Sequence, residues 1–253
     1  MKVATATVIA NEPVYDSAWI AWFRSPELSS RRAPGQFVMI RCSPEGGQPM
    51  FARAFSYYSV GDDRFAILYS VVGTGTAWLS SLRPGDHVFG YGPLGKGLRL
   101  PRDPGNLLLI GGGIGVAPLA DAAEMAIEAG HQVVVMMGAR SASALLPANH
   151  LPPEVEYLVS TEDGSTGSHG FVTEHLGECQ PWASRIYACG PNAMFASLAD
   201  TLRENGRRQR PEILMEEDMP CGWGICYGCT VFTKHGVRLC CKDGPRFNLF
   251  DVF

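Results

Sequence analysis

Cysteines near the C-terminus have the spacing of iron–sulfur ligands. Cys221, Cys226 and Cys229 form a C-x4-C-x2-C pattern, and Cys240-Cys241 follows after a short interval. This is the spacing of a plant-type [2Fe-2S] cluster, for which one tight loop turns several thiolates inward and aims backbone N–H groups at the sulfurs. Glycine suits such a loop because it adopts positive φ and lets the backbone approach a bound group. The loop contains Gly222, Gly224 and Gly228.

Two other uses of these thiols remain open. Four thiolates also bind a structural Zn2+, usually as two short C-x2-4-C pairs, whereas the adjacent Cys240 and Cys241 do not easily ligate one ion. A disulfide framework is typical of small secreted proteins, but this chain has 253 residues and gathers most of its eight cysteines at one end. The spacing favours the iron–sulfur cluster over both alternatives.

Composition limits the class of protein. The chain is 46% hydrophobic, which is ample for a buried core and for two domains. The formal net charge is −4 and the charges are interspersed, so we expect no nucleic-acid partner. The first residues lack the apolar core of a signal peptide, and the longest apolar run, 107–120, is too short to span a bilayer. We therefore expect a soluble, cytoplasmic protein with no membrane attachment.

The N-terminal hundred residues are predicted to form short strands separated by turns. Glycine- and proline-containing turns lie between segments that are rich in β-branched and aromatic residues, namely 3–10, 19–23, 36–42, 54–60, 65–72 and 87–91. Many short strands at this spacing indicate an antiparallel barrel or sandwich.

Two stretches in this region suit a nucleotide cofactor. Arg53-Ala54-Phe55-Ser56 carries an arginine that can pair with a pyrophosphate, a ring that can stack and a hydroxyl that can donate. On their own these four residues are better explained as an ordinary barrel strand with one surface arginine. The stretch 72–76, Val-Gly-Thr-Gly-Thr, shifts that balance, because it opens a predicted helix at 77–82 and free N–H groups at such a turn bind phosphate.

The middle hundred residues alternate between predicted strands and helices. Strand 106–110 runs through the glycine-rich turn 111–115 into a helix at 119–130, although Pro118 stands where the third glycine of a dinucleotide motif would be. The next strand ends before Arg140 and Ser141 instead of an acidic residue, so the choice between NAD and NADP stays open. A parallel sheet covered on both faces is completed by strands 132–137, 156–160 and 185–188 and by a helix at 192–205.

The remaining cysteines and the histidines are less informative. Cys189 follows the last of these strands, and it is either a buried apolar residue, the common role of a free cysteine, or a neighbour of a nicotinamide at the carboxyl edge of the sheet. Cys42 and Cys179 are predicted to have no functional role. The six histidines show no metal-ligand spacing with one another.

Taken in order, these motifs resemble the ferredoxin–NADP+ reductase superfamily. Residues 53–56 are similar to its R-x-[YF]-[ST] flavin strand, 72–76 to its G-x-G-T phosphate loop, and 92–95 to the loop that closes its barrel, while 111–118 and 189–191 resemble its nicotinamide half. The resemblance implies three parts: an antiparallel FAD-binding β-barrel at 1–101, a parallel-sheet α/β domain that binds NAD at 102–210, and a small C-terminal [2Fe-2S] subdomain at 211–253.

The block 216–247 narrows the resemblance to the electron-transfer subunits of two-subunit dihydroorotate dehydrogenases. In that family the last cluster ligand directly precedes Lys-Asp-Gly-Pro, as Cys241 does here. The resemblance therefore makes Cys240 the extra thiol and implies as ligands Cys221, Cys226, Cys229 and Cys241. Two departures concern the flavin, because Phe55 stands where many members have an aliphatic residue and Thr74 replaces the lysine of G-K-G-T.

The resemblance also implies which residues bind the organic cofactors. The expected FAD-binding residues are Arg53, Ala54, Phe55, Ser56, Leu68, Tyr69, Ser70, Gly75 and Thr76. The expected nicotinamide-binding residues are Gly111, Gly113, Gly115 and Cys189.

The implied function is electron transfer within a larger enzyme. The partner would be a dihydroorotate dehydrogenase catalytic subunit, a TIM barrel with FMN, in a heterotetramer of two copies of each chain. Electrons would pass through the [2Fe-2S] cluster and FAD to NAD+ in de novo pyrimidine (UMP) synthesis. This chain has no recognisable pyrimidine site, so we expect no dihydroorotate oxidation by it alone.

Three alternatives stay open. The same modules resemble subunits of NADH-dependent ferredoxin:NADP+ oxidoreductase, in which we expect an aspartate among the cluster ligands, and of sulfide dehydrogenase or hydrogenase complexes. The second alternative is a self-sufficient NADH reductase that passes electrons to a soluble acceptor. The third alternative, from another class, is a zinc-stabilised interaction module without enzymatic activity.

Overall fold

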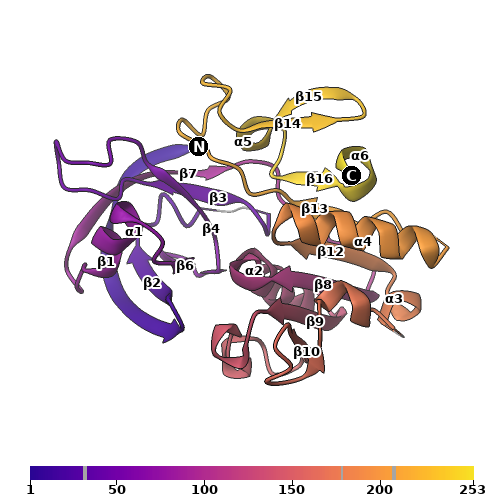
Figure 1. The fold of residues 1–253 in the computed structure, drawn as a ribbon. Coiled ribbons are helices and arrows are strands. Elements are labelled where there is room, and N and C mark those ends of the chain that lie inside the picture. The colour runs from indigo at the N-terminus through magenta and orange to yellow at the C-terminus, as the bar shows by residue number, and fades with distance from the viewer. Residues whose placement is uncertain (31–32, 178, 207–208) are drawn as a thin grey trace.

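The chain folds into a barrel, a sheet covered by helices, and a C-terminal segment that touches both. The computed structural model describes residues 1–30, 33–177, 179–206 and 209–253. Figure 1 shows the barrel at the left, the sheet with its helices at the right, and the C-terminal hairpin at the top. No helix in the described ranges is long and apolar enough to cross a membrane.

The barrel is a seven-stranded antiparallel sheet in the order β4-β3-β7-β1-β2-β6-β5. Its aromatic interior includes Phe23 and Phe65, whose rings stack at 5.2 Å. Each predicted segment contains a strand, although β1 continues to Tyr15 and the predicted segment 54–60 is divided into β4 and β5. One short helix, α1 (Thr74–Ser80), follows β6 in the chain and begins three residues before the predicted helix at 77–82. The strands are β1 (Lys2–Tyr15), β2 (Ala18–Arg24), β3 (Phe37–Ile40), β4 (Arg53–Ser56), β5 (Ser59–Val60), β6 (Arg64–Ser70) and β7 (His87–Leu94).

The second sheet has the order β11-β10-β9-β8-β12-β13-β16, and every pairing in it is parallel except that of β16. Its strands are β8 (Asn106–Gly112), β9 (Gln132–Ala139), β10 (Glu156–Thr161), β11 (Ser168–His169), β12 (Arg185–Cys189), β13 (Glu212–Leu214) and β16 (Arg246–Asn248). The helices between them are η1 (Gly113–Gly115), α2 (Val116–Glu128), η2 (Ala142–Ala144), η3 (Ala148–His150), η4 (Val172–His175), α3 (Cys179–Trp182) and α4 (Asn192–Glu204).

Alternating residues of the central strands bury against different helices. In β8, Leu107 and Leu109 belong to the core under α2, whereas Leu108 and Ile110 belong to the core under α4, which includes Phe195. This two-residue alternation places one helix on each face of the sheet. The expected fold class, an antiparallel barrel joined to a parallel α/β sheet, is confirmed.

The C-terminal segment contributes to two sheets. It forms a hairpin of β14 (Thr230–Thr233) and β15 (Gly236–Leu239), followed by α5 (Cys240–Asp243) and α6 (Leu249–Val252). Its remaining strands, β13 and β16, extend the parallel sheet at its edge, where Leu214 pairs with Arg246. Residues after 210 therefore belong in part to the α/β sheet as well as to the predicted cluster subdomain.

Candidate functional site

One cavity of about 510 Å³, here called the barrel cavity, brings the expected flavin residues together. It is lined by all nine of them: Arg53, Ala54, Phe55, Ser56, Leu68, Tyr69, Ser70, Gly75 and Thr76. The first four form β4, the next three end β6, and the last two begin α1. These elements are separate in sequence, so the convergence of three short motifs on one cavity arises only from the fold.

A threonine side chain fixes the backbone of the glycine-rich turn at the barrel cavity. The Thr76 side-chain oxygen accepts the backbone N–H groups of Val72 and Gly73, at 2.9 and 3.2 Å. A Cβ built on Gly73 would meet no atom within 4 Å, whereas one on Gly75 would press against Cys42 and Pro49. Gly75 is thus needed for packing, and Gly73 leaves free space beside the cavity, as a bound phosphate group requires.

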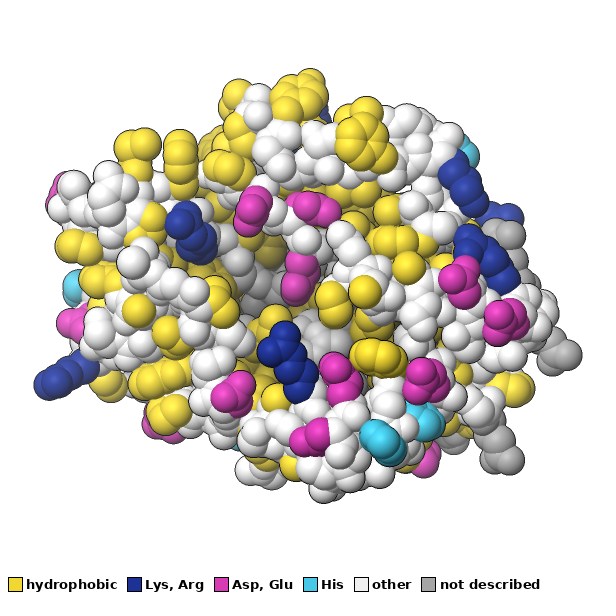
Figure 2. Space-filling view, viewed as in Figure 1, with side chains coloured by type: hydrophobic (Ala, Val, Ile, Leu, Met, Phe, Trp, Pro, Cys, Tyr) yellow, Lys and Arg dark blue, Asp and Glu magenta, His cyan; other side chains and the backbone are white. Residues whose placement is uncertain are grey.

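Two further parts of the chain complete the wall of the barrel cavity. Ile114 and Ala117 reach it from η1 and α2 of the parallel sheet, and Pro245 and the run 215–219 reach it from the C-terminal segment. Figure 2 shows a hollow near the middle of this face, with acidic side chains along its upper rim. The sequence did not identify these wall residues, because nothing in their local pattern shows that they meet a barrel strand.

The acidic side chains at this wall are partly removed from water. Burial raises the pKa of the Glu216 carboxyl, whose Oε1 accepts the Cys189 thiol at 3.6 Å. Cys189 is fully buried, and burial followed by the Glu216 charge raises its pKa well above the ordinary value. Burial, and next the charge of Asp218, also raises the pKa of Glu217. Cys189 therefore lies beneath the wall of the barrel cavity and contacts it through Glu216.

A second cavity, the sheet cavity, lies at the carboxyl ends of the parallel strands and has a volume of about 460 Å³. Gly113 lines it, as expected of a nicotinamide residue, whereas Gly111 and Gly115 do not line either described cavity. A Cβ on Gly115 would collide with the carbonyl of Cys189, so this glycine is needed for close packing of strand and helix. The remaining walls include Arg140, Glu162, Phe171, Thr173 and Met194.

The four expected cluster ligands lie in two neighbouring pairs. The Cys226 thiol hydrogen-bonds to Cys221, and the Cys241 thiol hydrogen-bonds to Cys229. Among described residues, no group of three or more His, Cys, Asp and Glu side chains is placed to hold one metal ion. Pairs of thiols fit a two-iron cluster, in which each iron takes two protein ligands.

Backbone N–H groups already point at these sulfurs. Trp223, Gly228 and Cys241 donate to the sulfurs of Cys221, Cys226 and Cys229, at 3.3, 3.4 and 3.4 Å. Burial acts to raise the pKa of Cys221, but N–H groups of Cys226, Trp223 and Ile225, together with the Cys226 thiol, lower it to about 6. The loop thus favours thiolate at this ligand, which is the form that binds iron.

The backbone of this cluster loop, residues 220–229, is shaped by positive φ angles. Gly222 and Gly224 have φ of 64° and 77°, and a Cβ on either would press on Met39 or Lys242. The third positive φ in the loop, 61°, belongs to Tyr227, a position for which the sequence had suggested Gly228. Gly228 is instead required because a Cβ there would meet the Pro220 ring at 3.0 Å.

Cys240 has a different environment from its neighbour. Its thiol is completely buried and donates to the carbonyl oxygen of Met215 at 3.2 Å. Cys241, in contrast, contacts the ligand Cys229 through both its thiol and its backbone N–H. The geometry therefore agrees with Cys241 as the fourth ligand.

Comparison with known proteins identifies the family. A profile described as the iron-sulfur cluster binding domain of dihydroorotate dehydrogenase B matches residues 216–253. A protein of Desulforamulus reducens named dihydroorotate dehydrogenase B (NAD(+)), electron transfer subunit, is 34% identical over 260 residues, covering 99% of this chain and 98% of its own. This chain belongs to that family of electron transfer subunits. An Aquifex aeolicus protein named as a homolog of the same subunit is 35% identical over 98% of this chain and 97% of its own.

A solved structure agrees with this assignment of fold. A chain of the NADH-dependent reduced ferredoxin-NADP oxidoreductase, studied for flavin-based electron bifurcation, superposes with a TM-score of 0.87 at 28% identity. The match covers 99% of this chain and 90% of the other. As a member of the electron transfer subunit family, this protein is a subunit of an NAD-linked flavin and iron–sulfur oxidoreductase, with FAD, a [2Fe-2S] cluster and NAD as cofactors. The expected resemblance and the expected cofactors are confirmed.

Proposed function

We propose that this chain is the electron-transfer arm of a two-subunit dihydroorotate dehydrogenase of UMP synthesis. In this proposal it carries electrons from a TIM-barrel catalytic partner with FMN, through the cluster and FAD, to NAD+. The names of the relatives support the reaction. The observation that carries the proposal is the barrel cavity, because its wall joins the flavin strand of the barrel, helix α2 of the parallel sheet, and the run 215–219 that leads directly into Cys221.

The residues that line the two cavities and the four thiols suit these groups. In the proposal, the nine residues of the barrel cavity hold FAD, and the thiols of the cluster loop and Cys241 hold the iron. Gly113 and the rest of the sheet cavity hold NAD, while Gly111 and Gly115 allow close packing against Val116 and the Cys189 carbonyl. A flavin exchanges electrons singly or in pairs, which is the chemistry required between a two-electron nicotinamide and a one-electron cluster.

The chain's own residues position these sites relative to one another. Tyr91 on β7 donates to the carbonyl oxygen of Cys221 and so attaches the cluster loop to the barrel. The Met215 N–H donates to the Pro245 carbonyl at 2.9 Å, which joins the two strands of the C-terminal segment at the cavity wall. The Cys189–Glu216 contact links the last central strand of the parallel sheet to the same wall. These contacts attach the cluster loop to the barrel, and strand β12 of the parallel sheet to the wall of the barrel cavity.

The cluster loop also offers a surface for the catalytic partner. Its side chains Trp223, Ile225 and Tyr227 are 48%, 74% and 65% exposed, and Phe232 and Val237 of the adjacent hairpin are exposed as well. Figure 2 shows hydrophobic side chains gathered along the top of this face. Exposed apolar side chains in one area are typical of a protein interface. The proposal places the partner subunit here, in an assembly with two copies of each chain.

Anaerobic co-purification from the native cells tests this function. The eluate is assayed for NAD+ reduction by dihydroorotate. The proposal predicts a flavin-containing partner and formation of NADH, and it predicts that Ile225→Asp loses the partner while keeping its own iron and FAD. An eluate that contains flavin and iron but makes no NADH from dihydroorotate would overturn the assignment of dihydroorotate as the substrate.

A second candidate is a subunit of an NADH-dependent ferredoxin:NADP+ oxidoreductase. The observation in its favour is the structural match over nearly the whole of both chains. The same co-purification separates the candidates, because a ferredoxin- and NADP+-dependent reaction of the eluate, without response to dihydroorotate, is expected only for the second.

A further inference from the structure

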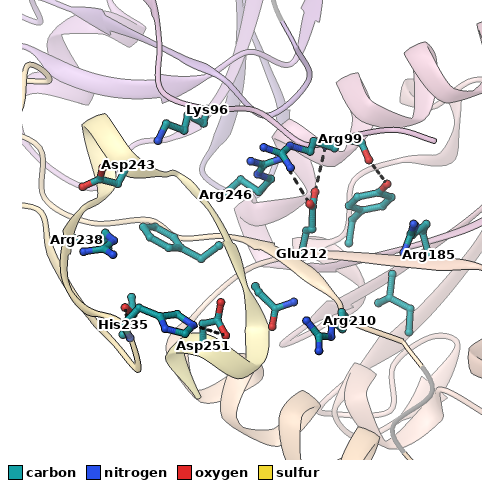
Figure 3. Close-up of a pocket in the computed structure, with 15 residues that line it drawn as sticks. Lys96, Arg99, Arg185, Arg210, Glu212, His235, Arg238, Asp243, Arg246 and Asp251 are labelled. Atoms are coloured by element: carbon teal, nitrogen blue, oxygen red, sulfur yellow. Dashed lines mark hydrogen bonds and ion pairs between the residues drawn. The ribbon is translucent and has the colours of Figure 1, made fainter. Parts of the chain in front are cut away.

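A third hollow, here called the basic groove, lies where the barrel, the parallel sheet and the C-terminal segment meet. Its volume is about 680 Å³. Figure 3 shows that its basic side chains come from all three parts of the chain. They are Lys96 and Arg99 after β7, Arg185 and Arg210 from the sheet and the approach to β13, and Arg238 and Arg246 from the C-terminal segment. None of its lining residues lines the barrel cavity or the sheet cavity.

The charge of the basic groove is opposite to that of the chain. The chain has 21 Lys and Arg against 25 Asp and Glu, yet six Lys and Arg line the groove against three carboxylates, Glu212, Asp243 and Asp251. Six cations around one hollow repel one another, and this repulsion is strongest where the surroundings exclude water. An anion in the groove would relieve it.

The carboxylates present are already engaged. Glu212 lies 3.5 Å from the Arg246 guanidinium and accepts the backbone N–H of Arg99 at 3.1 Å, while Asp251 lies 3.6 Å from His235. The third carboxylate, Asp243, accepts the backbone N–H of Leu239 at 2.9 Å.

The other basic side chains are left without such partners. Within the described ranges, no carboxylate lies at ion-pair distance from Lys96, Arg99, Arg185, Arg210 or Arg238. Five cations are thus available to a ligand.

Arg246 is the most constrained of the basic residues. Its side chain is only 13% exposed, and its Nη1 atom, which makes no hydrogen bond among described residues, lies 3.5 Å from the Glu212 carboxylate. The Glu212 carboxylate therefore holds the Arg246 guanidinium in place at the edge of the groove. The backbone on either side of Arg246 is fixed, because it pairs with Lys96 and Leu214. The guanidinium is therefore held at the groove by the fold.

The residue types indicate the chemistry of the ligand. Guanidinium groups bind phosphate through two parallel N–H···O bonds, which explains the preference for arginine at phosphate sites. Five of the six cations are arginine, and they extend from the hairpin at Arg238 to the sheet at Arg185. The volume is in the range of small-molecule sites. We propose that the basic groove binds a small phosphorylated anion with two or more phosphoryl groups, at a site separate from both cofactor cavities.

A ligand in this position would contact all three parts of the protein, namely the barrel, the parallel sheet and the C-terminal segment. Arg246 lines the groove, and the preceding residue, Pro245, lines the barrel cavity. Asp243, another lining residue, is two positions after the cluster ligand Cys241. The inference concerns a site of its own and stands whether or not dihydroorotate is the electron donor.

Calorimetric titration with inorganic pyrophosphate tests the proposal. The full-length, cofactor-loaded protein is used with saturating NAD+ at constant ionic strength, so that both cofactor cavities are filled. The expected result is one saturable site per chain. Binding should weaken at least tenfold in the double variant Arg185→Gln/Arg238→Gln, which changes two exposed side chains, and stay unchanged in the matched control Arg64→Gln/Arg83→Gln on the barrel.

Two results would overturn the proposal. The first is the absence of saturable pyrophosphate binding at millimolar concentration, and the second is equal affinity in the groove variant and its control. A parallel titration with a short polyglutamate peptide identifies a protein-docking surface instead: tight peptide binding without pyrophosphate binding would also contradict a phosphate site.

Discussion

The hydroxyl group of Tyr91, on barrel strand β7, donates a hydrogen bond of 3.1 Å to the backbone carbonyl oxygen of Cys221. The same tyrosine ring lies 5.7 Å from the ring of Trp223. Gly222, between these two loop residues, packs so closely on Met39 and Leu94 that a Cβ would collide with Met39. The cluster loop is therefore attached to the barrel at Cys221, the first expected ligand, and the position of this loop relative to the barrel cavity depends on the contact.

Replacing Tyr91 by phenylalanine removes the hydrogen bond and keeps the ring. Loss of a hydrogen bond that leaves the Cys221 carbonyl without its partner is expected to cost about 1 kcal/mol of stability. We expect a lower unfolding temperature and faster loss of iron to a chelator, with FAD content unchanged. Tyr15→Phe is a matched control, because the Tyr15 hydroxyl has no hydrogen-bond partner among described residues. Equal iron-loss rates in both variants would contradict a role for Tyr91 in holding the loop.

Cys240 and Cys241 should differ sharply when each is replaced by alanine. The Cys240 thiol donates to the Met215 carbonyl oxygen, whereas the Cys241 thiol contacts Cys229. Cys240→Ala should keep a full complement of iron and the visible spectrum of the cluster, at a cost of about 1 kcal/mol for the lost hydrogen bond. Cys241→Ala should lose the cluster. Iron and sulfide analysis decides between them, and loss of iron in Cys240→Ala alone would exchange their roles.

The reactivity of Cys221 in the iron-free protein should depend on pH in an unusual range. Its pKa of about 6 means that the thiolate is present above pH 6 and is lost as the pH falls through that value. An ordinary cysteine reaches the same half-point only near pH 8.5. Alkylation by iodoacetamide, followed site by site with mass spectrometry, should therefore fall by half near pH 6 at Cys221. Buried Cys189, with its raised pKa, should stay unreactive at neutral pH, and a half-point above pH 8 at Cys221 would refute the effect of the loop N–H groups.

Arg53 should contribute to flavin affinity without supporting the fold. Its side chain is exposed, and among the described residues it bonds only to carbonyl oxygens of its own segment, those of Phe51 and Ala52. Removing a charged hydrogen bond to a phosphate costs about 1.5–3 kcal/mol, so Arg53→Ala should weaken FAD binding by at least tenfold. The control is Arg64→Ala, also an exposed arginine on a barrel strand but outside the barrel cavity. Fluorescence titration of the flavin-free proteins measures both, and similar affinities would place FAD elsewhere.

Much of the fold could be predicted from the sequence because its signals are local. The barrel segments are rich in β-branched and aromatic residues. The glycine-rich turn that follows the apolar strand Asn106–Gly112 predicts the start of an α/β sheet. The expected flavin residues could be named because they lie in short motifs on single elements. Cys221, Cys226 and Cys229 could be named because they lie in one continuous stretch, whereas Cys241 was implied only by the resemblance to the family.

The wall of the barrel cavity could not be predicted in the same way. Glu216 and Pro245 reach it only because β13 and β16 pair side by side at the edge of the sheet, a contact between distant segments. The role of Gly115 could not be predicted for the same reason. A side chain at this position would collide with the carbonyl of Cys189, which is distant in the sequence, so the glycine is needed for packing. Long-range packing of this kind leaves no periodic pattern in either segment.

Anaerobic addition of NADH to the cofactor-loaded chain, compared with Cys226→Ser, tests the central claim most directly. The account predicts that in the unmodified chain NADH bleaches the flavin absorbance and produces the electron paramagnetic resonance signal of a reduced [2Fe-2S] cluster. Full reduction should consume about 1.5 NADH per chain, since FAD takes two electrons and the cluster takes one. Cys226→Ser should lose the cluster signal and still bind FAD that NADH bleaches. An unmodified chain whose flavin is reduced while its cluster stays oxidised, or a Cys226→Ser protein without FAD, would contradict the account.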